Sequence, residues 1–244
     1  MTIKEAVDIF YRLYGEHTGS TDAVGLDDFE ISRFINTAQY LELSGQVYNP
    51  HAKRGVGGEP LFAYEDTTHS SERWHVLVHR VLVSSDAQGK VFYSALQALM
   101  PTETIRMFDQ DLAVPSVVTV ETRNIPVYKI CNVARLGRMC RFVRTNDWWA
   151  QKKNIYTVDS ADYPWETRYN DHILVQPSGV VSITLDVMRY PRHVWYDRAS
   201  PTNNIDPELP DMTMHDVLLR AVQLASAAVG RQLYGIVQSE RIEM

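Results

Sequence analysis

The sequence predicts an α+β protein whose terminal helices pack together around a long, mainly antiparallel β middle region. Near both ends of the chain, apolar residues recur every three or four positions, which is the spacing of one helix face. The middle is instead rich in valine and alternates between apolar and polar residues, as strands do. The 244 residues are 45% hydrophobic and 22% charged, which is the composition of an ordinary globular protein with a sizeable core.

Two helices are expected at the start of the chain, forming a helical pair over residues 1–48. Each begins with a capping box, in which a polar residue and a glutamate three positions later satisfy free backbone amides. The boxes are Thr2 to Glu5 and Asp27 to Glu30, and the helices are expected to end near Gly15 and Gly45.

The middle region, residues 60–192, is predicted to be β-rich. Two hairpins are expected, one pairing 74–83 with 91–93 and the other pairing 172–176 with 180–190, because turn residues separate each pair. Further strands are expected at 115–120 and 125–130. A short helix is expected over residues 132–144, despite Gly137, with the arginines at three-residue spacing spread over a broad face of it.

The last helix is expected over residues 205–230, after a linker rich in proline and asparagine. Its wide apolar face predicts that it packs on the N-terminal helices, and Gly230 is a candidate cap. Residues 231–244 show little periodicity, so we expect a C-terminal arm that orders only against a partner.

Composition also restricts the classes of protein. Cys131 and Cys140 form no CxxC pair, which favours two buried thiols in a reducing compartment. No apolar run reaches the ~18 to 20 residues that a membrane helix needs, and the first residues do not resemble a signal peptide. The net charge of -6 argues against a protein whose whole surface grips nucleic acid.

One segment departs from this acidic balance. Between Lys129 and Lys153, seven basic residues accompany a single acid, so the segment carries +6 and the rest of the chain -12. Arginine and aromatic residues are typical of protein interfaces, and arginine also suits phosphate. The alternative is a solvated face paired within the chain. The candidate interface residues are Arg135, Arg138, Arg141, Arg144, Lys152, Lys153, Trp148 and Trp149.

Motifs for catalysis are weak. His75 and His79 lie four apart and could supply two metal ligands, but they lack the glutamate of the zincin motif. Asp109 and Asp111 could hold a cation or form an acid and base pair, although solvated loop charges are the simpler interpretation. We therefore expect no enzyme, no cofactor and no resident metal, and keep a soluble metal-dependent enzyme built on these residues as an alternative.

Three stretches carry a resemblance to a known group of proteins. They are the helix start Leu26-Asp27-Asp28-Phe29-Glu30-Ile31-Ser32-Arg33-Phe34-Ile35-Asn36-Thr37-Ala38-Gln39, the strand end Met188-Arg189-Tyr190-Pro191-Arg192, and Glu208-Leu209-Pro210 before the last helix. In this order they resemble the ring or adaptor proteins of the head-to-tail connector in crAss-like and related tailed phages.

The resemblance implies a non-enzymatic virion subunit that forms a ring of twelve copies beneath the portal protein. Genomic DNA would pass through the ring, and other connector or tail rings would contact it. The particle would be assembled in the bacterial cytoplasm. A tail-tube or tail-hub subunit of the same particle is the closest alternative, and a nucleic-acid-binding protein that uses residues 135–153 is a third.

Overall fold

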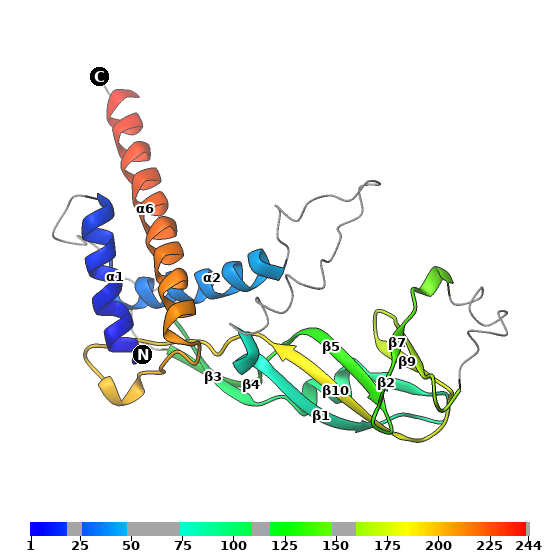
Figure 1. The fold of residues 1–244 in the computed structure, drawn as a ribbon. Helices are drawn as coiled ribbons and strands as arrows, with labels where there is room; N and C mark the ends of the chain where they lie inside the picture. The colour runs from blue at the N-terminus through cyan, green and yellow to red at the C-terminus, as the bar shows by residue number, and fades with distance from the viewer. Residues whose placement is uncertain (19–25, 48–73, 109–117, 148–159, 243–244) are drawn as a thin grey trace. The chain divides into compact units, whose positions relative to one another are not determined.

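The computed structural model describes residues 1–18, 26–47, 74–108, 118–147 and 160–242 (Figure 1). It shows the predicted α+β class, with helices toward both ends of the chain and mostly antiparallel strands between them. The chain divides into a helical unit, Met1–Val76 with Pro191–Met244, and a β unit, Leu77–Tyr190.

In the described residues of the helical unit, the long helices are α1 (Ile3–Thr18), α2 (Asp28–Val47) and α6 (Asp211–Ile242). The first capping box is present, because the Glu5 carboxylate accepts from the Thr2 N–H (2.8 Å) and the Thr2 hydroxyl accepts from the Glu5 N–H (3.3 Å). In the second box, Glu30 accepts from the Asp27 N–H at 3.2 Å. The predicted helix starts are confirmed.

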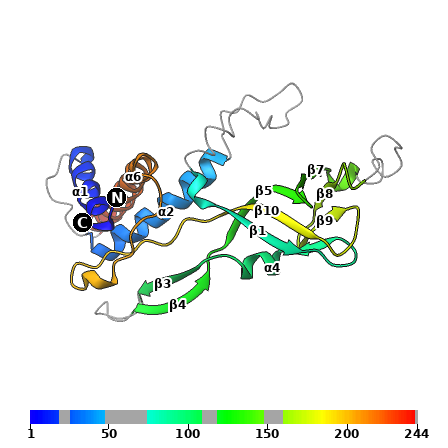
Figure 2. The same ribbon diagram turned by 60° about the horizontal axis from the view of Figure 1, so that its bottom comes forward.

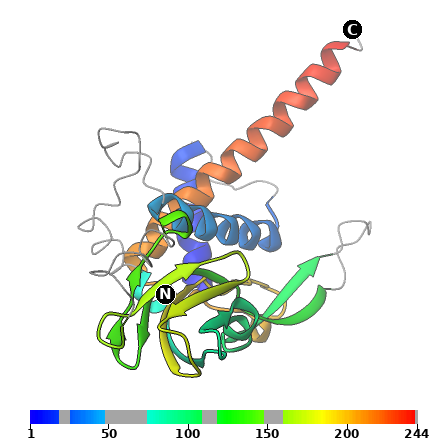
Figure 3. The ribbon, with the colours of Figure 1, turned by 90° about the vertical axis from the view of Figure 1, so that its right-hand side faces the viewer.

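α6 packs against both α1 and α2, as its apolar face predicted. Met214, Val217, Leu218, Ala221 and Ala225 are fully buried along that face. Figures 1 and 3 show α6 running on past the other two helices. The expected helix end at Gly230 is wrong, since the helix continues to Ile242 through both Gly230 and Gly235, each of which costs a helix only about 1 kcal/mol relative to alanine.

The segment between the β unit and α6 is held on α2 by side chains. Trp195 and Ile205 form an isolated bridge, and the short helix η3 (Pro201–Asn203) lies between them. The Ser32 hydroxyl accepts a hydrogen bond from the Tyr196 N–H at 3.0 Å. This segment therefore belongs to the helical core, although it has almost no regular structure.

The β unit contains two four-stranded sheets and a separate two-stranded ribbon (Figure 2). The first sheet has the strand order β1-β10-β5-β6. Its strands are β1 (Val78–Ser84), β10 (Ser182–Arg189), β5 (Val127–Arg135) and β6 (Arg138–Met139). The short helix η1 (His75–Leu77) precedes β1 in the chain. The second has the order β2-β9-β8-β7, with β2 (Lys90–Phe92), β9 (His172–Gln176), β8 (Trp165–Arg168) and β7 (Arg141–Phe142). The ribbon pairs β3 (Thr102–Phe108) with β4 (Val118–Asn124).

Both expected hairpins are wrong in their pairing, although most of their strands are present. β1 pairs with β10 and β2 pairs with β9, so chain neighbours lie in different sheets. The segment from β1 to β2 therefore runs beside the segment from β9 to β10, and both pass from one sheet into the other. At the bend, the Ser85 hydroxyl donates to the Gly179 carbonyl (2.7 Å) and the Val175 N–H donates to the Gly89 carbonyl (2.8 Å). Strands that switch sheets in this way form corners.

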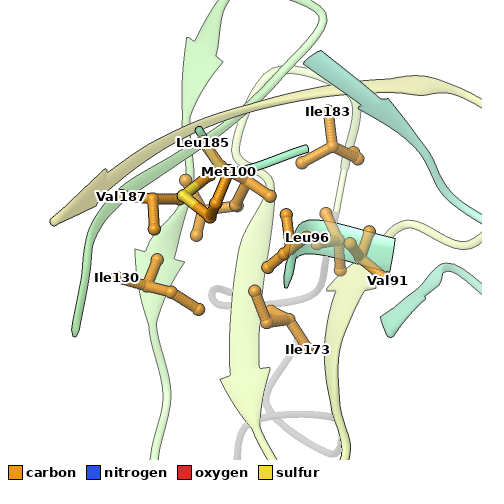
Figure 4. Close-up of a cluster of buried hydrophobic side chains, with 10 residues drawn as sticks. Val91, Leu96, Met100, Ile130, Ile173, Ile183, Leu185 and Val187 are labelled. Carbon is orange, nitrogen blue, oxygen red and sulfur yellow. The ribbon is translucent and has the colours of Figure 1, made fainter. Parts of the chain in front are cut away.

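The hydrophobic core of the β unit lies between the two sheets and the helix α4 (Tyr93–Ala98) (Figure 4). Leu96 of α4 lies beside Val91 and Ile173 of the second sheet and Ile183 of the first. The Gln97 side chain anchors α4 by donating to the Asn124 and Ile125 carbonyls and accepting from the Val127 N–H. This short helix was absent from the sequence prediction, which placed Tyr93 in a strand.

Candidate protein interface

The helix expected over residues 132–144 is wrong, because the chain there forms a hairpin between β5 and β6. Leu136 and Gly137 form its turn, with φ angles of 49° and 80°. Positive φ at both central residues is typical of the tight turn that matches strand twist. The regular spacing of arginines therefore reflects strand and turn positions and not helix turns.

The residues that follow this turn lie along the edges of both sheets, and we call residues 136–144 the edge segment. β6 is the last strand of the first sheet and β7 is the last strand of the second. Between them, the Cys140 N–H donates to the Val133 carbonyl (2.8 Å) and the Arg141 N–H donates to the Pro164 carbonyl (2.9 Å). The edge segment is thus bonded to both sheets and has a defined conformation.

Large apolar side chains of the edge segment are exposed. Leu136 is 63% exposed, Met139 61% and Phe142 52%. Arg138, Arg141 and Arg144 are exposed between and after them. Exposed apolar groups surrounded by charged ones are typical of protein–protein contact sites.

A row of side chains with an exposed apolar residue at each end crosses the outer face of the first sheet. Leu82, Thr184, Ala134 and Met139 are direct cross-strand neighbours, one from each strand. Directly paired residues lie on the same face of a sheet, so the four form a row. Leu82 is 68% exposed at the far end of this row. Sequence reasoning missed Leu82, because only the pairing of β1 with β10 brings it into line with Met139.

An ion pair beneath the edge segment supports Phe142. The Glu166 carboxylate is buried, and the Arg168 guanidinium binds both of its oxygens at 2.7 and 3.3 Å. Arg168 also donates to the Ile130 carbonyl and lies 5.3 Å from the centre of the Phe142 ring. A cation is attracted to the face of an aromatic ring, so the Arg168 guanidinium, held by Glu166 and Ile130, stabilises the position of the half-exposed Phe142 ring.

The arginines of the predicted interface differ in their environments. Arg138 forms an ion pair with Asp162 at 2.7 Å, and both side chains are exposed, so the pair contributes little to stability. Arg135 is buried, with 8% of its surface exposed. It belongs to the inner row Val83, Ile183, Arg135 and Arg138, which starts in the core and ends in two facing arginines.

The thiol beside Arg135 is unreactive by its environment. Burial and, to a smaller extent, the nearby Glu166 carboxylate raise the pKa of Cys140 to about 12, against a lowering by Arg135. Burial also raises the pKa of Cys131. Both cysteines are free thiols. Both side chains are half-buried, so the expectation of two buried thiols is met only in part.

Four of the predicted interface residues, Trp148, Trp149, Lys152 and Lys153, lie outside the described residues, as do Asp109 and Asp111 of the enzyme alternative. His75 lies exposed in η1, and His79 lies on β1, where its Nε2 accepts a hydrogen bond from Arg189 at 2.8 Å. No group of three or more His, Cys, Asp or Glu side chains suited to a metal occurs within the described part of the chain.

Formal charge is divided unequally between the two units. The β unit has 13 Lys and Arg against 11 Asp and Glu, which gives it a formal charge of +2. Because the whole chain carries -6, the helical unit carries -8. The exposed arginines of the edge segment lie in the β unit. The two units thus differ in the sign of their formal charge.

Comparisons with protein-family models and with curated proteins find no match to this chain. Among the helices that the structure describes, none combines the length and apolarity needed to cross a bilayer.

Proposed function

We propose that this chain is a structural subunit of a phage virion, assembled with further copies of itself into a ring of the head-to-tail connector through which genomic DNA passes. A ring of twelve copies beneath the portal protein follows from the resemblance in the sequence. The proposal is supported by the place of the resembling residues in the fold and by the division of charge.

Residues of the stretches that carry the resemblance make structural contacts in the fold. Asn36 of the first stretch hydrogen-bonds Val194, and the Arg192 N–H of the second donates to the Glu208 carboxylate of the third. Leu209 is buried at the start of α6. The first and third stretches, and the end of the second at Pro191 and Arg192, thus lie in the helical unit, while Met188 to Tyr190 end the β unit.

The observation that carries the proposal is the division of charge between units of +2 and -8, with an exposed apolar and basic edge on the first. Two different surfaces that complement each other favour a head-to-tail contact between copies. Such heterologous contacts close into rings when the rotation per copy allows it. An assembly of this kind needs no catalytic group.

Electron microscopy of the purified chain, alone and mixed with the portal protein encoded beside it, tests the proposal. We expect rings of fixed symmetry, alone or on the portal. Rings that bind only tail proteins would assign the chain to the tail tube or hub instead. Persistent monomers that ignore the portal would refute a virion ring of either kind.

A double charge-reversal variant tests whether the basic edge takes part in assembly. Arg138→Glu with Arg141→Glu should raise the concentration needed for assembly by about tenfold or more, because the basic edge would then repel an acidic partner. Arg12→Glu with Arg220→Glu is the matched control, since both residues are exposed on helices of the acidic unit. This control changes net charge equally but should leave assembly intact. Equal effects of the two pairs would show that net charge alone matters.

The nucleic-acid alternative is tested with the same variants. A basic surface that binds DNA loses affinity steeply as salt rises, and the Arg138 and Arg141 reversals would abolish that binding. We expect no such salt-dependent binding by the wild-type chain at physiological ionic strength.

A further inference from the structure

The edge of the first sheet that lies opposite the edge segment is formed by β1, and its backbone is open. In an antiparallel pair, alternate residues exchange hydrogen bonds with the partner strand, and the residues between them direct their backbone groups the other way. The Ser85 N–H donates to the Val181 carbonyl, so in this register the odd-numbered residues of β1 bond to β10. The N–H and carbonyl groups of Arg80 and Leu82 therefore point away from the sheet, where the described residues offer them no partner.

The apolar side chains at this edge are incompletely covered. Leu82 is 68% exposed on the outer face of the sheet. On the inner face, Val81 and Val83 pack against the core of the β unit but are themselves only half-buried. Edge strands of native proteins are usually very short or interrupted by a bulge, whereas β1 runs for seven residues in unbroken register with β10. An added strand would satisfy the backbone and extend the core at this edge.

The ribbon of β3 and β4 has a second open edge, which lies on β4. The Ile125 N–H donates to the Pro101 carbonyl, so the odd-numbered residues of β4 bond to β3, and the backbone groups of Val120 and Thr122 point outward. Both of these side chains are exposed, Val120 by 59%. Figure 2 shows the ribbon apart from the two sheets. Because two strands alone are marginally stable, the ribbon would gain from pairing with a further strand.

The two open edges match each other. β1 and β4 have seven residues each. Antiparallel pairing through their outward backbone groups places Leu82 beside Val120 when Arg80 lies beside Thr122. Directly opposed residues share one face of a sheet, so the two exposed apolar side chains would cover each other. Within the described part of one chain both edges stay open, in different sheets, so a second copy supplies what each edge lacks.

We propose that β4 of one copy pairs with the β1 edge of a second copy and adds the next strand to its first sheet. Strand addition of this kind takes its affinity from main-chain hydrogen bonds and its specificity from alternate side chains. The contact joins two different edges, so it is heterologous and can repeat around a ring. The inference rests on the proposed ring and names the strands that link its copies.

A substitution to proline tests the main-chain contact. Leu82→Pro removes an N–H that points away from β10, and edge strands accept proline in this orientation. It should raise the concentration needed for assembly by about tenfold or more, whereas the control Leu82→Ala, which keeps the N–H, should raise it by less than about threefold. Circular dichroism checks that both monomers are folded. Equal effects of the two folded variants would overturn strand addition, because the side chain alone would then make the contact.

Disulfide cross-linking identifies the partner strand, and it does so even if Leu82→Pro fails to fold. Two variants are made in a background of Cys131→Ser and Cys140→Ser, one with Leu82→Cys and the other with Val120→Cys. Opposed Cα atoms of an antiparallel pair lie about 5.5 Å apart, within the range that a disulfide spans. When the variants are mixed under assembly conditions with oxidised glutathione, mass spectrometry should find disulfides that join one variant to the other.

The outcomes separate this inference from the proposed function. Rings that form from the mixture without the cross-link would overturn the inference and leave the ring intact. Disulfides between two Leu82→Cys chains would also overturn it, because the occupant of the edge would then be a second β1. A wild-type chain that never assembles would refute the proposed function and the inference together.

Discussion

Asn36 and Val194 exchange two hydrogen bonds within the helical unit, the Asn36 amide donating to the Val194 carbonyl at 2.9 Å and accepting from its N–H at 2.8 Å. The side chain of one α2 residue thus provides both bonds that a neighbouring strand would provide. Both residues are buried, so these backbone groups have no access to water. The Asn36 amide also contacts the His193 ring at 2.9 Å.

Replacing Asn36 by alanine should therefore cost about 2–4 kcal/mol, because the Val194 N–H and carbonyl are left buried and unsatisfied. Chemical denaturation followed by circular dichroism measures the change in the free energy of unfolding. Thr37→Ala is the matched control, since its hydroxyl bonds only the Arg33 carbonyl of its own helix on an exposed face. A similar loss in both variants would show that Asn36 has no special role.

The corner between the two sheets should be sensitive to the size of residue 89. Gly89 has φ of +82°, and a Cβ there would lie 2.3 Å from the Val175 carbonyl oxygen. Gly137 has nearly the same φ, +80°, but no atom lies within 4 Å of its would-be Cβ. We expect Gly89→Ala to cost about 3 kcal/mol or more and Gly137→Ala about 1 kcal/mol, because only the first adds a collision to backbone strain. Equal losses, measured by urea titration, would exclude the collision.

Thiol chemistry tests the environment of Cys140. Because burial and Glu166 raise its pKa to about 12, very little thiolate exists at pH 8. Iodoacetamide should therefore alkylate Cys140 at least about tenfold more slowly in the native chain than in urea. In the Cys131→Ser variant, Cys140 is the cysteine that remains, so mass spectrometry of the alkylated chain over time measures the alkylation rate of Cys140 alone. Rapid native alkylation would place Cys140 in a more open or more basic site than the structure shows.

The pH dependence of stability tests the central strand of the first sheet. Asp186 on β10 accepts from Arg80 on β1 at 2.8 Å and from Asn132 on β5 at 3.2 Å, and these bonds lower its pKa, the Arg80 bond most. A lowered carboxyl pKa contributes stability that is fully present above the ordinary carboxyl pKa and is lost as pH falls through the folded value.

Asp186→Asn should consequently flatten the fall in stability between about pH 5 and pH 2 relative to wild type. The effect should be modest and should shrink in high salt, because the Arg80 side chain is exposed. Thermal unfolding across this pH range measures it, and Asp147→Asn, an exposed carboxyl, is the control. Identical pH profiles for wild type and Asp186→Asn would show that Asp186 makes no ionic contribution.

Local patterns predicted several elements of this fold correctly. The capping boxes at Thr2 and Asp27 mark the starts of α1 and α2, because their hydrogen bonds join residues only three apart. The alternation in β10 also appears in the structure, where Ile183, Leu185 and Val187 are buried. Each of these signals depends on neighbouring residues alone, so the sequence contains it.

Tertiary structure decided which strands pair and which residues form the candidate interface. Adjacent strands such as β1 and β2 contribute to different sheets because burying Val91 and Ile183 in one core requires two sheets facing each other, and a local turn signal carries no information about that packing. The local sequence of residues 132–144 is compatible with a short helix, yet pairing with β5 makes a hairpin there. The sequence by itself determined the helix starts, the strand alternation and the basic segment. Long-range pairing buried Arg135, exposed Met139 and aligned Leu82 with it, because only the folded sheet brings residues so distant in the chain together.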